Sequence, residues 1–102
     1  MKRIMSVAAA ALVLLATHAI AQQSYPDHPI RILVGFPAGG PPDLVARLLA
    51  EKFSAAWGKS VVVENATGSG GNIAVDRAAK ATPDGYTLLM ASNAIVINPS
   101  LY

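Results

Sequence analysis

Three short apolar runs alternate with two stretches of helical periodicity, and this alternation constrains the fold more than any other feature. The runs occupy residues 30–36, 60–64 and 86–91. Nearly continuous apolar runs of this length are typical of strands that are buried on both faces of a parallel sheet. Strands that alternate with helices predict a parallel sheet with right-handed crossovers. The predicted fold class is therefore α/β, with the element order βαβαβ.

Two helices are predicted between the strands. The first starts at Asp43 and stops at Gly58, and Asp43 and Arg47 form an exposed acid–base pair on it. The second helix covers residues 72–81. Helical spacing of apolar residues predicts the buried face of the first helix, which consists of Val45, Leu48, Leu49, Phe53 and Ala56.

Small, polar or glycine residues follow each predicted strand. They occupy residues 37–42, 68–71 and 92–93. Ligands of parallel α/β sheets bind beyond the carboxyl ends of the strands, and a helix amino end can hold an anion through its unpaired N–H groups. The loops therefore fit an anion site, and their glycines fit equally well with tight turns that bind nothing.

Position alone favours structural roles for the polar residues of these loops. Asp43 fits an N-cap better than a ligand contact. Ser92 and Asn93 fit turn or cap positions. His28 lies in a proline-flanked lead-in and is expected to be a solvated residue without a partner.

The amino end has the three parts of a cleavable export signal. Lys2 and Arg3 supply positive charge, residues 7–16 are apolar, and Ala19 and Ala21 are the small residues of a peptidase site. The apolar run is shorter than the roughly 20 residues of a membrane-spanning helix. Residues 1–21 are therefore expected to be a signal peptide, and residues 22–102 the mature, exported chain.

Composition and failed motifs exclude several classes of function. The chain has eight basic and six acidic residues, and removal of Lys2 and Arg3 leaves a formally neutral chain without a basic patch for nucleic acid. Cysteine is absent and His28 is the only histidine after cleavage, so no metal cluster is expected. The dinucleotide fingerprint fails at Ile73, and a nucleophile elbow around Ser69 fails at Thr67. Neither a cofactor nor catalytic activity is predicted.

Several blocks of sequence, in order along the mature chain, resemble one known family. The blocks are YPDHPIRI (25–32), FPAGGPPDLVAR (36–47), VVVEN (61–65), GSGG (68–71), ATPDGYTLL (81–89) and NPSLY (98–102). They resemble the Bug family, the extracytoplasmic solute receptors of tripartite tricarboxylate transporters. The chain departs from the family pattern at Gly35, where proline is usual, and at Pro42, where a hydroxyl residue is common.

The resemblance implies a periplasmic receptor with two α/β lobes that close on a small carboxylate and deliver it to the membrane subunits of the transporter. Ligand binding in the family uses loop backbone groups and ordered waters, with the loop after the first strand prominent. Transferred by motif, the site comprises Phe36, Pro37, Ala38, Gly39, Gly40 and Asp43, with Ser69, Gly70, Gly71, Ser92 and Asn93 as further members.

Chain length bears on how much of such a receptor is present. Members of the family are several times longer, so residues 22–102 are expected to form the amino-terminal part of the first lobe, with the second lobe absent. Two alternatives stay open at this point. One is a nonfunctional remnant of such a receptor, and the other is a small nucleotide-dependent α/β enzyme.

We predict cleavage after Ala21, because Ala19 and Ala21 form the peptidase site. Intact-mass measurement of exported protein should give a chain that begins at Gln22. Recovery of the protein from the membrane fraction with Met1 retained would contradict this prediction.

Overall fold

A computed structural model describes residue 1 and residues 24–101, and the predicted signal peptide and its cleavage site lie outside the described residues except for Met1. Its strands and helices are β1 (Ile30–Val34), α2 (Pro41–Trp57), β2 (Val61–Asn65), α3 (Asn72–Lys80), β3 (Thr87–Met90) and α4 (Ala94–Ile97), with 3-10 turns η2 (Ser69–Gly71) and η3 (Asn98–Ser100). None of the helices between residues 24 and 101 combines the length and apolarity needed to span a bilayer.

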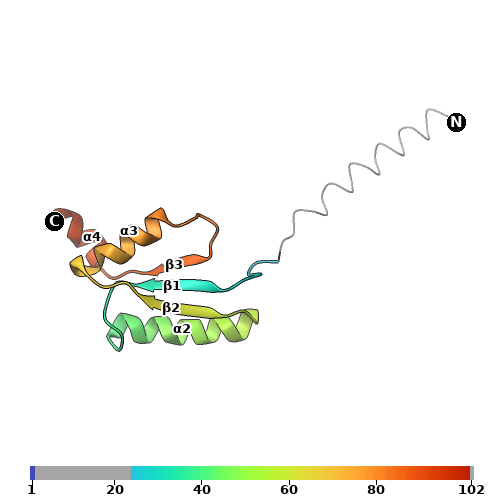
Figure 1. Cartoon of the computed structure of the whole chain (residues 1–102), viewed down its shortest axis with the longest axis horizontal. Coiled ribbons are helices and arrows are strands. Elements are labelled where there is room, and N and C mark those ends of the chain that lie inside the picture. The colour runs from blue at the N-terminus through green and yellow to red at the C-terminus, as the bar shows by residue number, and fades with distance from the viewer. Residues whose placement is uncertain (2–23, 102) are drawn as a thin grey trace.

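The three strands form one parallel sheet in the order β2-β1-β3. In the central strand, Arg31 pairs with Val62 on one side and with Thr87 on the other. The predicted α/β class and the βαβαβ order are confirmed. Figure 1 shows the sheet between two helices, with α2 on one face and α3 on the other.

The opposite placement of the helices follows from the strand order. The connection from β1 to β2 and the connection from β2 to β3 cross the sheet in opposite directions, so crossovers of one hand place their helices on opposite faces. Ile32 and Val34 pack with Ala46 and Ala50 of α2. Leu33 packs on the other face in a cluster with Ala74 of α3. Strand β1 therefore contributes to the hydrophobic clusters on both faces of the sheet.

The prediction that the first strand is buried on both faces is confirmed for β1 apart from the exposed Arg31, whereas the second strand, also predicted to be buried, is not fully buried. Residues of β2 and β3 are half-buried or exposed, and Val62 is 50% exposed. The reason is their position at the two edges of the sheet, where each has a neighbouring strand on one side only. Strands β1 and β3 are two residues shorter than predicted, whereas β2 has the predicted length and is shifted by one residue.

The face of α2 that contacts the sheet also differs from the prediction. The helix starts at Pro41, two residues before the predicted start, and Gly58 caps its end with a φ of 64° as expected. Ala46 and Ala50 are buried, whereas Val45 and Leu48 are half-exposed. Small alanine side chains let the helix approach the sheet closely. Of the larger residues predicted for the buried face, Leu49 and Phe53 are half-buried, and only Val45 and Leu48 lie on the outer side.

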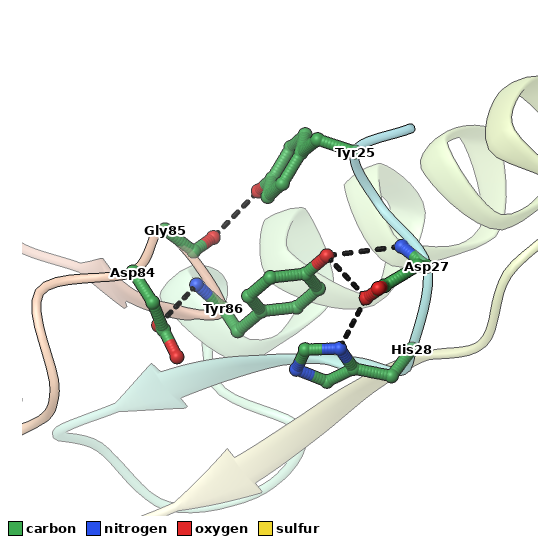
Figure 2. A network of polar contacts seen from close by, with 6 residues as sticks. All are labelled: Tyr25, Asp27, His28, Asp84, Gly85 and Tyr86. Carbon is green, nitrogen blue, oxygen red and sulfur yellow. Dashed lines mark hydrogen bonds and ion pairs between the residues drawn. The ribbon is translucent and has the colours of Figure 1, made fainter. Parts of the chain in front are cut away.

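The segment before β1 is fastened to the start of β3 by hydrogen bonds and ring contacts (Figure 2). The Tyr86 hydroxyl donates to Asp27 Oδ1 at 2.8 Å and accepts the Asp27 N–H at 2.9 Å. The Tyr25 hydroxyl donates to the Gly85 carbonyl. The hydrogen bond from Tyr86, followed by that from His28, holds the pKa of Asp27 below its ordinary value.

His28 is exposed as predicted, but the prediction that it lacks a partner is wrong. Its Nδ1 contacts the Asp27 carboxylate, and its ring stacks on Tyr86 with the ring centroids 3.5 Å apart. Figure 2 shows both contacts. Asp27 is adjacent in the sequence and was visible as a possible partner, whereas Tyr86 is far along the chain and local sequence does not reveal it.

We expect Tyr86→Phe to loosen this fastening, because it removes the hydroxyl that joins both the amide and the carboxylate of Asp27. Amide hydrogen exchange should become faster at Asp27, with a lower thermal midpoint. Tyr25→Phe is the comparison, since it removes only the contact to Gly85 and should leave the Asp27 amide protected. Unchanged exchange at Asp27 in Tyr86→Phe would show that the ring contacts alone hold the segment.

Candidate functional site

The carboxyl ends of the three strands meet at one edge of the sheet. Val34 pairs with Asn65 of β2 and with Met90 of β3, so the strands end in register. The structure brings the sequence-predicted residues together at this edge, in the loops after the strands and in the first turn of α2. They are Phe36, Pro37, Ala38, Gly39, Gly40, Asp43, Ser69, Gly70, Gly71, Ser92 and Asn93.

The first loop (residues 35–40, after β1) and the second loop (residues 66–71, after β2) lie in direct contact. A Cβ atom on Gly35 would lie 2.8 Å from the Gly71 Cα, closer than folded proteins tolerate. The resemblance leads one to expect proline at this position, and the close approach of the second loop explains why glycine occupies it. Phe36, Gly71 and Ser92 line a small hollow between the loops. Its volume of about 10 Å³ is near the lower limit for one water molecule.

Asp43 is the buried centre of a hydrogen-bond network at this edge. Its Oδ2 accepts the Gly39 N–H at 2.9 Å and Arg47 Nε–H at 2.8 Å. Its Oδ1 accepts Asn65 Nδ2–H at 2.9 Å. The predicted pair with Arg47 is confirmed, but Asp43 is 1% exposed rather than exposed, and the N-cap of α2 is Gly40. The contacts from Arg47, Gly39 and Asn65 lower the pKa of Asp43 to about 2.

Two asparagines that were not predicted as site residues connect the loops. Asn65 Nδ2 also donates to the Phe36 carbonyl at 2.9 Å, which joins the end of β2 to the first loop. Asn98 Nδ2 donates to the Gly70 carbonyl at 2.9 Å and to Asn72 Oδ1 at 2.8 Å. In the sequence, Asn65 directly follows the apolar run 60–64 and Asn98 begins the NPSLY block. These positions could have marked both as candidate site residues, but the sequence does not reveal their hydrogen-bond partners.

The second loop has an unusual backbone. Residues 68–71 all have positive φ, and Ser69, with a φ of 49°, is the one non-glycine residue of this kind in the described part of the chain. The Asn98 side chain holds the Gly70 carbonyl in this arrangement. In the third loop, Ser92 Oγ accepts the Ala94 N–H at 3.2 Å in a turn, and Asn93 is the N-cap of α4, so both residues occupy the predicted turn or cap positions.

The start of α2 offers fewer hydrogen-bond donors than the sequence suggested. Pro41 and Pro42 have no N–H group. Gly39 donates to Asp43, and Gly40 donates to the Pro37 carbonyl at 3.2 Å. Within the first two loops, as far as the structure describes them, several exposed residues have an amide without a protein acceptor, namely Ala38, Thr67, Gly68, Ser69 and Gly70. These amides could donate to an oxyanion. Between residues 24 and 101, no three acidic or histidine side chains are grouped closely enough to hold a metal ion.

Comparison with known proteins gives a consistent set of matches. The family model described as tripartite tricarboxylate transporter family receptor matches residues 45–102. Among solved structures, the periplasmic binding protein BugD is 51% identical with a TM-score of 0.61, and the match covers 64% of this chain and 22% of that protein.

Two further solved structures come from Rhodopseudomonas palustris and contain ligands. One, solved with adipate, is 38% identical with a TM-score of 0.70 and is matched over 71% of this chain and 24% of its own. The other, MatC with bound malate, is 40% identical with a TM-score of 0.61, over 64% of this chain and 22% of its own. The chain spans 23–30% of the length of the first curated relatives it matches, which are 39–46% identical to it.

We expect Asp43→Asn to lower the thermal unfolding midpoint more than Asp76→Asn does. The two residues are matched, because each forms a pair with a basic residue four positions later at 2.8 Å. Only Asp43 is buried, and an amide there turns an NH₂ group toward donors that need an acceptor. Equal midpoints for the two variants near neutral pH would contradict the central role of Asp43.

The same residue should make stability depend on pH in acid. Its pKa in the folded chain, about 2, lies below the ordinary value of 3.8. Its contribution to stability is therefore fully present above about pH 4 and is lost as the pH falls toward 2. Denaturant titrations across this range should show a smaller acid-dependent loss in Asp43→Asn than in the parent chain.

Proposed function

Because the chain belongs to the tripartite tricarboxylate transporter receptor family, the Bug family, we propose that it forms the amino-terminal part of the first lobe of a periplasmic receptor for a small carboxylate. The family consists of substrate-binding receptors rather than enzymes. In this proposal the receptor delivers its ligand to the membrane subunits of the transporter, and the export signal takes it to the periplasm.

The observation that carries the proposal is the convergence of three loops at the carboxyl edge of the sheet, with exposed amides on two of them. Backbone N–H groups can hold a carboxylate without a basic side chain. The loops themselves contain neither lysine nor arginine, and Arg47, the basic side chain at this edge, is paired with Asp43, which agrees with a backbone site. The ligands of the two related structures, adipate and malate, support a dicarboxylate as the class of ligand.

Within this site we assign Asp43 a positioning role. Its two oxygens already accept three hydrogen bonds from the protein, one of them from the Gly39 amide. Its negative charge would also repel a carboxylate at close range. Asp43 therefore fixes the loop that presents Ala38, and the contacts with a ligand come from the exposed amides.

We expect the chain to bind malate and adipate weakly, with dissociation constants of about 1 mM or weaker. The described loops form one wall of a site, whereas ligand pockets in general bury at least about 70% of the ligand's surface. Titration followed by ¹H–¹⁵N correlation spectra should move the amide signals of Ala38, Ser69 and Gly70. A micromolar constant would show that one wall is sufficient.

We expect Gly39→Asp to abolish these loop shifts. Gly39 is exposed, and a Cβ there meets no atom within 4 Å, so the added carboxylate would occupy the space that a ligand must enter. Loss of one hydrogen bond to a charged group costs about 1.5–3 kcal/mol, equivalent to at least about tenfold in affinity.

Two variants separate charge from backbone strain. Gly39→Asn has nearly the same shape without the charge and should retain part of the response. Gly58→Asp is the matched control at the other end of α2, because Gly58 also has positive φ and open space around it. Loop shifts that persist in folded Gly39→Asp, at unchanged ligand concentration, would exclude the first loop as part of the site.

A further inference from the structure

A second cluster of charged side chains lies away from the loops, on the face of the sheet that α3 covers. Helix α3 ends at Lys80, and its last two turns form one wall of an open hollow of about 270 Å³. The sheet forms the floor of the hollow with Arg31, Leu33 and Glu64, and α3 contributes Asp76, Arg77 and Lys80. Figure 1 shows α3 over the sheet with its carboxyl end directed away from the loop edge.

Two arginines in this hollow share one carboxylate. Arg31 Nη1 lies 3.3 Å from Glu64 Oε2, and Arg77 Nη1 lies 3.2 Å from Glu64 Oε1. Each guanidinium uses one nitrogen at a rather long distance, although a guanidinium carries five N–H donors. Among the described residues, neither guanidinium has a second hydrogen-bond acceptor.

The charges of the hollow do not balance. Lys80 is paired with Asp76 at 2.8 Å, so that pair is neutral. Arg31 and Arg77 together exceed Glu64 by one positive charge. Both arginine side chains are about half-exposed, at 51% and 56%, so their remaining donors are accessible from the hollow.

From this arrangement we propose a second site, in which Arg31 and Arg77 bind a small oxyanion, either a carboxylate or a phosphate. Two guanidinium groups on either side of Glu64 can each offer a pair of parallel N–H groups to such an anion. The hollow is slightly smaller than the roughly 300 Å³ at the lower end of ordinary ligand pockets, so it suits a small ion.

This site is independent of the loop site. Arg31 lies near the start of β1, at the other end of the strand from the loop that follows Val34. Arg77 lies in the last turn of α3, whereas the second loop precedes that helix. A basic last turn also compensates the partial negative charge at the carboxyl end of a helix. That role requires neither Arg31 nor the shared contact with Glu64.

The test is a titration of the purified chain with sodium phosphate and, separately, with sodium succinate at constant ionic strength. The Nε–Hε signals of Arg31 and Arg77 should shift in a saturable manner with the preferred anion. Arg31→Gln and Arg77→Gln should each weaken binding about tenfold. Lys52→Gln removes an exposed cation of α2 and should leave the affinity unchanged.

Glu64→Gln is expected to change the anion affinity in the opposite direction. It removes the carboxylate that competes for both guanidinium groups and should tighten binding roughly fivefold. Misfolding cannot produce such a gain. Gly39→Asp should leave the arginine shifts intact, which distinguishes this site from the loop site. Non-saturable shifts, equal losses in Lys52→Gln and the arginine variants, or weaker binding in Glu64→Gln would each overturn the proposal.

Discussion

The buried carboxylate of Asp43 is the interaction on which the loop edge of this structure depends. A buried charge is stable only when it is paired and hydrogen-bonded. Asp43 meets this requirement with three partners from three places, namely the first loop, the next turn of α2 and the end of β2. The first loop, the first helix and an edge strand are therefore held in one arrangement. Because Asn65 also binds the Phe36 carbonyl, the same network fixes where the first loop leaves the sheet.

Small residues make the layers and loops approach closely enough for this network to form. Ala46 and Ala50 place α2 against the sheet, and Ala74 does the same for α3. Gly35 and Gly71 allow the first and second loops to touch. Close packing leaves little empty volume between the loops, so binding at this edge would rely on exposed backbone amides rather than on a deep cavity.

The remaining polar groups are distributed over separate parts of the molecule. The hydrogen bonds between Asp27 and Tyr86 lie at the amino ends of the strands, opposite the loops, where they fix the segment that leads into β1. The hollow with Arg31 and Arg77 lies on the face of the sheet that α3 covers. These places are linked through the backbone, since the Arg31 N–H donates to the Tyr86 carbonyl at 2.9 Å and Glu64 directly precedes Asn65, so substitutions at one place can affect another.

The sequence by itself determined the class of fold, the order of its elements and the edge at which the loops gather. Apolar runs and helix stops such as Gly58 can be recognised from neighbouring residues alone. The parallel arrangement follows from general rules of topology for alternating strands and helices. Only the tertiary structure decided that Ala46 and Ala50 face the sheet instead of Val45 and Leu48. It also decided that Asp43 is buried and that Arg31 and Arg77 both contact Glu64. The physical reason is that α2 has apolar residues on more than one side, so packing selects which side is buried. The contacts of Asp43 with Asn65 and of Arg31 with Glu64 join residues distant in the chain, so they exist only once the layers have packed.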